Sequence, residues 1–456
     1  MHNHNESKKE FYRKLCKLVI PIIIQNILSA AISSADVIML NYVGQSSISA
    51  VSLASQYASI LFAVFYGLST GTTMLCSQYF GKGDMEAIKI VQGIALRISM
   101  ISAFAFALSA LVIPQHLMRL FTNDTELITL GAVYLRYMSI AYLCWGVIEI
   151  YMATLRSVGQ VAICSVLSTF TFICNILLNA VFIFGLFDAP QLGAMGVAIA
   201  TSASRLLELF GCFIISFFNK HVKISLRYIF VKNEVLFKDF IRLSLPALAN
   251  DVIWGLAFAM YSVIIGHLGS DAVAANSFVI IVRNFGTIFC YGIASASTII
   301  LGNTLGENRL QDAKKEGTEI MKLTILTGIF GGIIVLVSIP LVLSYASTSL
   351  SDTALHYLKY MLLINTYYIT GTAVNTTLIA GVFRAGGDSM FGMICDTIDM
   401  WGYAVPLGFF AAFVLKLPVL WVYFLLCTDE FVKWPWVLKH YKSGKWIKNI
   451  TRDNLY

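Results

Sequence analysis

The chain alternates long apolar stretches with short polar segments. A helix needs roughly 20 predominantly apolar residues to cross the hydrocarbon core of a bilayer. Twelve stretches reach that length, at residues 17–41, 54–77, 93–114, 133–155, 161–186, 193–218, 242–266, 280–302, 320–343, 357–382, 390–414 and 418–438. We therefore predict an all-α polytopic membrane protein with twelve transmembrane helices.

The polar gaps divide these helices into two groups of six. The longest gap, 219–241, carries five Lys and Arg residues and predicts a cytoplasmic linker. The predicted organisation is an N-lobe at 1–218, the linker at 219–241, a C-lobe at 242–438 and a basic cytoplasmic tail at 439–456.

Composition agrees with a membrane protein. The chain of 456 residues is 58% hydrophobic and 12% charged, whereas soluble domains average about 45–50% and 25%. The polar first fourteen residues lead straight into a full-length span, which predicts no cleavable signal peptide. A net charge of +7 would suggest nucleic-acid binding in a soluble protein. Here the positions of Lys and Arg explain it, and we expect no nucleic-acid partner.

The basic residues also predict orientation. With a cytoplasmic N-terminus, the inner segments hold 25 of the 32 Lys and Arg residues and the outer segments hold four. The positive-inside rule then predicts that both termini lie in the cytoplasm. We expect a multi-pass protein of the plasma (inner) membrane. The tail mixes Trp with Lys, and it either lies along the inner headgroups or is a floppy basic segment.

The two halves repeat each other at a nearly constant offset of 225 to 228 residues. Six of the eight prolines pair in this way, as Pro21 with Pro246, Pro114 with Pro340, and Pro190 with Pro418. YLRYM at 134–138 returns as YLKYM at 357–361, and LRSVGQ at 155–160 returns as FRAGGD at 383–388. Since each half has six spans, the copies share one orientation and form a parallel repeat. Secondary transporters built in this way bind substrate between the halves and rock one half against the other.

The first helix carries a buried acid. Four polar residues recur on it at steps of four, four and three and share one face: Gln25, Ser29, Ser33 and Asp36. A carboxylate inside a bilayer costs about 2.5–3.5 kcal/mol on insertion scales, so Asp36 should face protein or water. It is a candidate for binding a proton, an ion or substrate, and the alternative is a structural anchor for a neighbouring helix.

Further polar residues lie inside spans of the N-terminal half. Asn175 and Asn179 are one helical turn apart, and with Asp36 and the Thr201 hydroxyl they would form an oxygen-rich pocket for a proton or a hard monovalent cation. Hydrogen bonding between helices is the alternative for both Asn residues. Arg205 is three residues from Glu208, and the two charges should neutralise each other. Glu149 is either a second titrating site or a partner of Arg205.

The C-terminal half has a different pattern of polar residues. Four residues share one helix face: Asp251, Trp254, Phe258 and Tyr261. A carboxylate beside an aromatic stripe suits an organic cation, and the alternative is aromatic packing around one polar anchor. Asp396 and Asp399 are three residues apart, and their repulsion favours holding a proton. Asp429 and Glu430 lie close to Lys433 and predict a neutralised cluster near the inner face.

No enzyme signature is present, so we expect a protein without catalytic residues and without an organic cofactor. The absence of a Walker A motif argues against ATP hydrolysis within this chain, which leaves an ion gradient as the energy source. All seven histidines fall in termini and predicted loops, and this argues against a transition-metal site. The only inorganic ligand expected is the coupling ion, H⁺ or Na⁺.

Several segments resemble one family when they are taken in order. They are the first helix from Pro21 to Asp36, SQYFGKGD at 77–84, the duplicated LRSVGQ and FRAGGD, and NILLN at 175–179 followed by GAMGVAIAT at 193–201. Over residues 15–440 the chain resembles the multidrug and toxic compound extrusion (MATE) family. The resemblance implies two pseudo-symmetric six-helix lobes around a V-shaped central cavity and cation-coupled export of amphipathic, often cationic compounds.

The resemblance also implies roles for residues. Asp36 matches the coupling acid of the family, and Asn175, Asn179 and Thr201 match its N-lobe cation site. Because some members have Asp at the position of Asn179, the resemblance leaves H⁺ and Na⁺ both open. Asp251 lies close to the C-lobe acid of some members without aligning with it.

The expected function is a monomeric antiporter in contact with membrane lipids that exports small-molecule organic cations and drugs. A flippase for lipid-linked oligosaccharides and a non-transporting receptor or scaffold are the alternatives.

Overall fold

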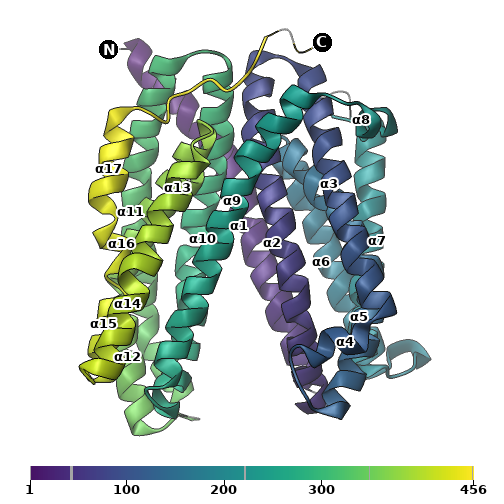
Figure 1. Ribbon diagram of the computed structural model, residues 1–456, viewed down its shortest axis with the longest axis vertical. Helices are drawn as coiled ribbons and strands as arrows, with labels where there is room; N and C mark the ends of the chain where they lie inside the picture. Colours follow the sequence, from purple (N-terminus) through teal and green to yellow (C-terminus); the bar gives the residue numbers. More distant parts are fainter. Residues whose placement is uncertain (1, 42–44, 220–221, 349, 454, 456) are drawn as a thin grey trace. The chain divides into compact units, whose positions relative to one another are not determined.

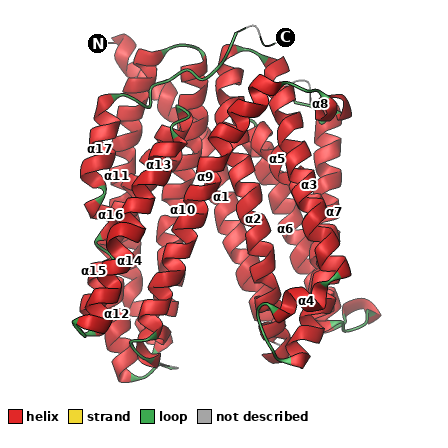
Figure 2. Ribbon diagram, in the orientation of Figure 1, coloured by secondary structure: helices red, strands yellow, loops and turns green. Residues whose placement is uncertain are grey.

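The computed structural model describes residues 2–41, 45–219, 222–348, 350–453 and 455. The side chains of residues 2–7, 29–38, 40, 41, 45 and 226 lie outside this description. Within the described ranges every regular element is a helix (Figures 1 and 2). Packing divides the chain into two compact units. The N-terminal unit is Ile24–Ser244 with Arg452–Tyr456, and the C-terminal unit is Met1–Ile23 with Leu245–Thr451.

The helices of the first half follow the predicted spans. The elements are α1 (His2–Asn41), α2 (Gln45–Lys82), α3 (Met85–Val112), α4 (Pro114–Arg119), α5 (Thr125–Ser157), α6 (Val161–Phe184), η1 (Leu186–Asp188), α7 (Gly193–Phe218) and α8 (Leu226–Phe230). Within the N-terminal unit α5 packs against α2, α3 and α7. The core between them is made of Ala, Leu, Ile and Val side chains together with aromatic rings such as Phe65 and Tyr142.

The second half continues with α9 (Glu234–Gly266), α10 (Ser270–Gly306), α11 (Leu310–Ala346), α12 (Asp352–Thr376), η2 (Thr377–Phe383), α13 (Ser389–Asp396), η3 (Thr397–Ala404), α14 (Val405–Phe409), η4 (Phe410–Val414), α15 (Val419–Leu426), α16 (Asp429–Val432) and α17 (Trp434–Ser443). The three elements η2, η3 and η4 are π-helical. Such wider turns are rare and often mark functional sites. The boundaries of the lobes and linker stay predictions.

Nine helices in the described ranges are long and apolar enough to cross a membrane. They correspond to nine of the predicted spans: α2, α3, α5, α6, α7, α9, α10, α11 and the run Ser389–Val414. The remaining predicted spans coincide with α1, with α12 and η2, and with α15 to α17. The last of these is broken into short helices where a charged segment, Asp429 to Lys433, enters the protein interior.

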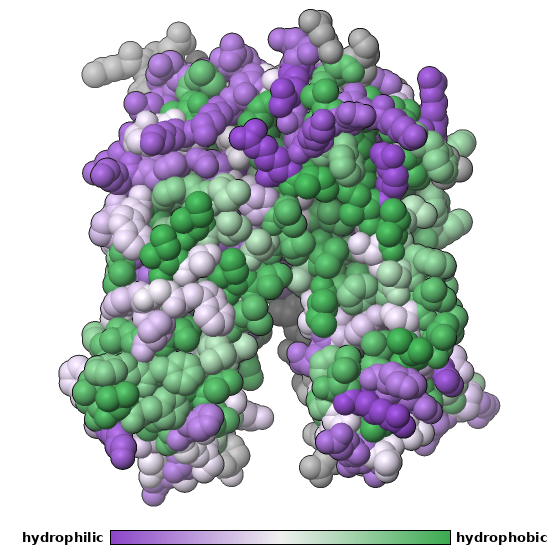
Figure 3. All heavy atoms as spheres, viewed as in Figure 1, coloured by the Kyte–Doolittle hydropathy of each residue, from purple (hydrophilic) through white to green (hydrophobic). Residues whose placement is uncertain are grey.

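Apolar side chains also cover the outside of each unit. In Figure 3 hydrophobic residues occupy the middle of the helices of either unit, and hydrophilic residues gather towards the helix ends. On α11 one run of large apolar side chains is exposed: Ile325, Leu326, Ile329, Phe330, Ile333, Leu336 and Val337. A soluble monomer rarely exposes so large an apolar surface, whereas a lipid-facing helix requires it.

The backbone repeats between the halves as the sequence predicts. Gly83, directly after α2, has φ 82°, and Asn308, which follows α10, has φ 60° at the matching position. Gly159 and Gly387, in the repeated LRSVGQ and FRAGGD segments, have φ 79° and 73°. Left-handed turns at matching places show that the duplicated sequence folds into duplicated connections.

The prolines of the first span in each half lie inside helices. Pro21 is inside α1 and Pro246 is inside α9, as predicted. Each removes one backbone donor from its helix.

The predicted tail packs onto the C-terminal unit. Trp446 is almost fully buried, its indole Nε1 donates to the Tyr441 carbonyl at 3.1 Å, and the two rings stack at 5.8 Å. His440 Nε2 lies 2.7 Å from Asp388 Oδ2. The floppy alternative is therefore wrong for residues 434–446.

Candidate functional site

The predicted polar trio of the N-terminal unit comes together in the structure. Asn179 Nδ2 donates to Asn175 Oδ1 at 3.2 Å along α6, and Asn175 Nδ2 donates to the Thr201 hydroxyl on α7 at 3.4 Å. Asn175 and Asn179 are both buried. The geometry agrees with both interpretations of the sequence. Asn175 forms a hydrogen bond between α6 and α7, and the amide and hydroxyl oxygens of the three residues lie close together.

The predicted acid of this site cannot be placed beside the trio. The backbone of Asp36 lies in α1, but its side chain, with those of Ser29 and Ser33, is outside the described residues. Gln25, on the same predicted face, donates from Nε2 to the Ser168 hydroxyl on α6 at 3.4 Å. The role of Asp36 therefore stays a prediction.

Two ion pairs inside the N-terminal unit each join residues of a single helix. Arg205 Nη1 lies 2.6 Å from Glu208 Oε2, which agrees with the predicted neutralisation. Glu149 pairs with Arg156 at 3.0 Å, two helical turns away, and accepts a hydrogen bond from Ser69 at 3.0 Å. Arg205 is therefore not the partner of Glu149.

A larger charged site lies in the C-terminal unit around Lys433. Its Nζ atom is 3.2 Å from Asp396 Oδ1, 3.6 Å from Asp399 Oδ2 and 3.2 Å from Glu430 Oε2. All four side chains are buried, and Asp399 is fully excluded from solvent. We name these four residues the Lys433 cluster. The predicted Asp396 and Asp399 pair therefore exists, with an ammonium group between the two carboxylates and Glu430.

Neighbouring helices supply hydrogen bonds to this cluster. From α12, the Thr372 hydroxyl donates to Glu430 Oε1 at 3.3 Å and Asn375 Nδ2 donates to Glu430 Oε2 at 2.6 Å. From α9, Asn250 Nδ2 donates to Asp396 Oδ2 at 2.7 Å. Neither oxygen of Asp399 has a hydrogen-bond partner within the described part of the chain. Asp399 is therefore the carboxylate with the weakest local stabilisation.

A fourth carboxylate adjoins the cluster. Asp429 is fully buried, and its Oδ2 accepts a hydrogen bond from the Tyr261 hydroxyl at 2.9 Å. Its Oδ1 accepts one from the Glu430 backbone amide at 2.7 Å. The sequence predicted Asp429, Glu430 and Lys433 as a neutralised inner-face group. Their position inside the apolar stretch 418–438 is the signal that marks them as buried.

The predicted substrate face on α9 has partners within the protein itself. Asp251 Oδ1 lies 2.9 Å from Arg384 Nη2, and this arginine is buried. The aromatic stripe forms as predicted, since the Trp254 and Phe258 rings are 4.3 Å apart and the Phe258 and Tyr261 rings 5.3 Å. A cation does stack on the stripe. It is the chain's own Arg283, from α10, 4.6 Å above the Phe258 ring.

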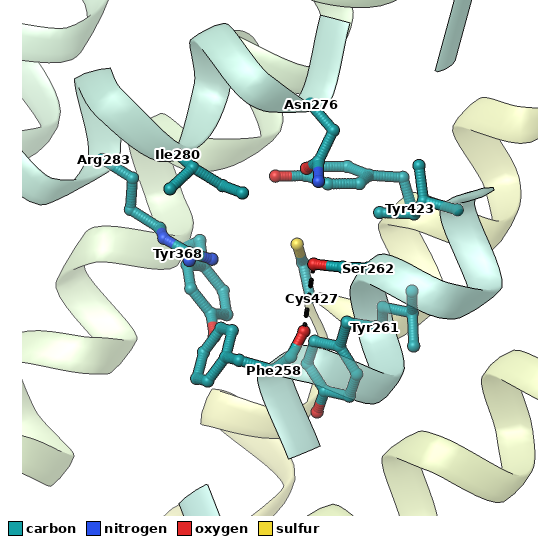
Figure 4. A pocket seen from close by; sticks show the side chains of 11 residues that line it. Phe258, Tyr261, Ser262, Asn276, Ile280, Arg283, Tyr368, Tyr423 and Cys427 are labelled. Carbon is teal, nitrogen blue, oxygen red and sulfur yellow. Dashed lines mark hydrogen bonds between the residues drawn. The ribbon is translucent and has the colours of Figure 1, made fainter. Parts of the chain in front are cut away.

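Arg283 points into a pocket between α9, α10, α12 and α15 (Figure 4). The pocket has a volume of about 20 Å³, which exceeds the roughly 10–15 Å³ needed for one water molecule. Its lining consists of Phe258, Tyr261, Ser262, Ile265, Asn276, Ile280, Arg283, Tyr368, Tyr423, Leu426 and Cys427. Sequence reasoning placed Arg283 inside a span without a role.

No transition-metal or calcium centre is apparent in the described ranges, where no three His, Cys, Asp or Glu side chains are arranged to hold a metal ion.

Known proteins share this architecture over almost their whole length. The chain is 25% identical over 443 residues to the uncharacterized transporter YisQ of Bacillus subtilis, covering 95% of each. It is 23% identical over 458 residues to the probable multidrug resistance protein NorM of Thermotoga maritima, covering 99% of this chain and 97% of NorM. A mutant of the Vibrio cholerae MATE transporter VcmN superposes with a TM-score of 0.87 at 16% identity, covering 97% and 99%.

The fold is therefore that of an all-α integral membrane protein built from two repeated halves, as predicted from the sequence, and nine helices in the described ranges are long and apolar enough to span a membrane. The sequence model of the MatE family matches residues 21–181 and 246–410, once in each half. The chain belongs to this family, the multidrug and toxic compound extrusion transporters that its motifs resemble. The cavity between the lobes stays a prediction.

Proposed function

We propose that the chain is a secondary antiporter that exports amphipathic organic cations in exchange for H⁺ or Na⁺. It acts as a monomer in the plasma membrane, surrounded by lipids, with both termini in the cytoplasm. Its relatives include probable multidrug resistance proteins, and its sequence has no ATP-binding motif that would supply another source of energy.

The observation that supports this proposal most is the excess of buried acid in the C-terminal unit. Three carboxylates contact one ammonium group in the Lys433 cluster, and Asp429 adjoins them. Buried charges are stable only when they are compensated. A proton or a bound monovalent cation would supply the missing positive charge, and its release on the other side of the membrane would couple the ion gradient to the cluster.

The N-terminal unit contains a second candidate site for the coupling ion. Asp36 with the oxygen atoms of Asn175, Asn179 and Thr201 would suit a proton or Na⁺, because hard monovalent cations prefer oxygen ligands. One elementary charge crossing 100 mV contributes about 2.3 kcal/mol, which is enough for a coupling ion to sustain a substrate gradient.

Proteoliposomes loaded with ethidium test the proposal. An inward proton gradient and an inward sodium gradient are imposed separately on the wild type, on Asp36→Asn and on Asp399→Asn. Asp352→Asn, at an exposed acid that begins α12, serves as the control. We expect one gradient to drive efflux and Asp36→Asn to abolish it.

The other outcomes are also informative. Efflux that survives in Asp36→Asn but is lost in Asp399→Asn would move the coupling site to the Lys433 cluster. Absence of gradient-driven efflux in the wild type would contradict the antiporter proposal. Transport of a lipid-linked oligosaccharide would then favour a flippase, and binding without ion flux would favour a receptor or scaffold.

A further inference from the structure

The chain continues beyond α17 and changes from one unit to the other. Residues up to Thr451 belong to the C-terminal unit, and the segment that begins at Arg452 belongs to the N-terminal unit. We name residues 447–453 the strap. These residues lie outside any helix, so the contacts at the two ends of the strap decide how firmly it is held.

The first end of the strap is fixed to the C-terminal unit by Trp446, which is 1% exposed. A Cβ built on Gly317 of α11 would lie 2.9 Å from the Trp446 ring, and the Trp446 carbonyl leaves no room for a Cβ on Gly386, which follows η2. His440 of α17 lies 2.7 Å from Asp388 in the same connection. A buried indole contributes a large packing area, so this end is a lasting anchor.

The other end is held by charged and polar groups of the N-terminal unit. The Arg452 guanidinium pairs with both oxygens of Asp239 on α9, through Nε at 2.5 Å and Nη2 at 2.7 Å. Lys82, the last residue of α2, lies 2.6 Å from Asp453 Oδ1 and donates to the Arg452 carbonyl at 2.7 Å. The Arg452 amide donates to the Tyr79 hydroxyl at 3.3 Å. Paired donors on a carboxylate fix the geometry, so this surface holds the strap in one register.

The two ends differ in strength. Trp446 is buried, whereas the Arg452 side chain is 52% exposed and that of Asp453 is 88% exposed. Exposed ion pairs contribute little individually and weaken in salt. Here they act together, because the anchored Trp446 keeps the strap at a high effective concentration beside them. The contact with the N-terminal unit is therefore reversible, and the contact at Trp446 is not.

The linker between the halves follows an equivalent path. The Tyr228 carbonyl of the linker leaves no room for a Cβ on Gly93 of α3, as Trp446 crowds Gly317 of α11. Gly93 and Gly317 are 224 residues apart, close to the offset of the repeat. The linker leaves this contact and continues as α9, which enters the C-terminal unit at Leu245. The strap leaves the equivalent contact and reaches the N-terminal unit, so it repeats the course of the linker in the opposite direction.

The length of the strap limits movement. Five residues separate Trp446 from Arg452, and an extended chain spans at most about 20 Å from one to the other. While both ends are attached, the two anchor points cannot move further apart than this. Transporters with parallel repeats rock one half against the other, so a strap attached at both ends restrains that motion.

We propose that the strap is a reversible brake on transport. It docks on the surface formed by Tyr79, Lys82 and Asp239, and it must leave this surface during each transport cycle, with Trp446 as its fixed end. The braking role rests on the proposed export function, whereas docking can be measured without transport.

Cleavage by trypsin after Lys448, an exposed residue of the strap, measures docking in the full-length protein. Proteolysis follows the population of the open form, so we expect Arg452→Glu to speed this cleavage about fivefold. Adding Asp239→Arg should restore the slow rate through a reversed pair. Arg227→Glu, the same change at an exposed residue of α8, is the control and should have no effect.

Salt gives a matching measurement on the wild type. Ions screen exposed pairs, so a rise from about 50 to about 500 mM NaCl should bring the wild-type cleavage rate close to that of Arg452→Glu. Equal rates for the wild type and Arg452→Glu at low salt would overturn docking. Failure of Asp239→Arg to restore the slow rate would overturn the assigned docking surface.

A reversible cross-link tests whether the strap must leave its site. The Cys16→Ser protein, which lacks an exposed thiol, receives Lys82→Cys and Asp453→Cys, and a reducible bis-maleimide joins the two. We expect ethidium export from proteoliposomes to fall at least about tenfold and to return on reduction, because the units can no longer rock freely. The same cross-link between Asp388→Cys and His440→Cys joins α17 to its own unit and should leave export unchanged.

The brake and the antiporter proposal fail in different ways. Unchanged export after the Lys82→Cys and Asp453→Cys cross-link would overturn the brake. Arg452→Glu should export ethidium at least as fast as the wild type, and loss of export in this variant would also overturn the brake. Absence of gradient-driven export in the wild type would contradict the antiporter proposal and the brake together, and cleavage at Lys448 would still decide docking.

Discussion

The two units of this transporter share one repeated sequence, yet they differ in where their buried charged side chains find ionic partners. In the N-terminal unit Arg205 pairs with Glu208 and Arg156 with Glu149, each on its own helix, whereas Arg97 donates to the Val231 carbonyl and makes no ion pair in the described ranges. In the C-terminal unit Lys433 gathers acids from two further elements, and Arg283 makes no ion pair in the described chain. A duplicated scaffold can therefore keep its helices and connections while its polar interior changes.

The difference has an energetic meaning. An ion pair on one helix stays intact wherever that helix moves, so it contributes little to the free energy of a conformational change. A cluster spread over η3, α13 and α16 depends on how those elements pack, and a change in its protonation or ion occupancy alters that packing. The C-terminal unit is thus the half in which ion binding would change structure most.

The largest expected effect comes from removing the central cation of the Lys433 cluster. Lys433→Met leaves Asp396, Asp399 and Glu430 buried without their ammonium partner. Breaking a buried pair in this way costs about 3–5 kcal/mol. The melting temperature in detergent should fall sharply, whereas Lys442→Met, at an exposed residue of α17, should leave it unchanged.

A double variant checks that the loss is electrostatic. Adding Asp396→Asn to Lys433→Met removes one of the uncompensated charges and should recover part of the melting temperature. If the double variant is less stable than Lys433→Met, packing around the lysine stem decides the effect and not its charge.

The next effect compares the two arginines that lie over aromatic rings. Arg205→Gln leaves Glu208, which is 3% exposed, without its partner and should destabilise the protein by roughly 3 kcal/mol. Arg283→Gln removes a charge that has no acidic partner and should change stability by less than about 1 kcal/mol. Melting temperatures of the two variants, measured side by side, test whether paired and unpaired arginines differ as the structure indicates.

A second substitution that restores the stability of Arg205→Gln provides the control. Glu208→Gln combined with Arg205→Gln should return the melting temperature close to that of the wild type. Equal losses for Arg205→Gln and Arg283→Gln would show that Arg283 has a counter-charge in solution and would contradict the contrast between the units.

The same contrast shows what the sequence could predict. The length of the apolar stretches was sufficient to predict the helices, because the bilayer imposes that length on every span. The paired prolines and the repeated segments predicted the duplication, and left-handed turns at Gly83 and Asn308 agree with it. Spacing along one helix also predicted Arg205 with Glu208 and the stacking of Trp254, Phe258 and Tyr261.

Contacts between distant segments could not be predicted in this way. Asp251 meets Arg384 across 133 residues, and Lys433 meets Asp396 across 37. Periodicity shows which residues share a face but not which helix packs against that face. For this reason we predicted from the sequence that the aromatic stripe binds an organic cation, whereas in the structure the guanidinium of Arg283 lies over the Phe258 ring.

A smaller effect is expected where the pocket and the cluster meet. Tyr261→Phe removes the hydroxyl that donates to Asp429 at 2.9 Å and leaves the ring in place. Hydrogen bonds to charged groups contribute about 1.5–3 kcal/mol, so the melting temperature should fall by less than in Lys433→Met. Tyr345→Phe, at a ring that is 74% exposed, is the matched control and should have no effect. An unchanged melting temperature in Tyr261→Phe would show that Asp429 does not rely on this donor.

The smallest expected effect concerns two equivalent turns, one in each half of the chain. Gly83 and Asn308 occupy matching left-handed positions, with φ 82° and 60°, and no atom lies within 4 Å of a Cβ built on Gly83. Because space is available, Gly83→Asn should cost only the backbone preference, below about 1 kcal/mol, and Gly83→Val should cost more, since β-branched residues avoid this conformation. Asn308→Gly should be neutral within about 0.5 kcal/mol, because Asn already tolerates the left-handed region. The melting temperatures of the three variants test whether the two turns are equivalent. A larger loss of stability for Gly83→Asn than for Gly83→Val would mean that the two turns differ in backbone conformation, so that the units diverged in backbone as well as in buried charge.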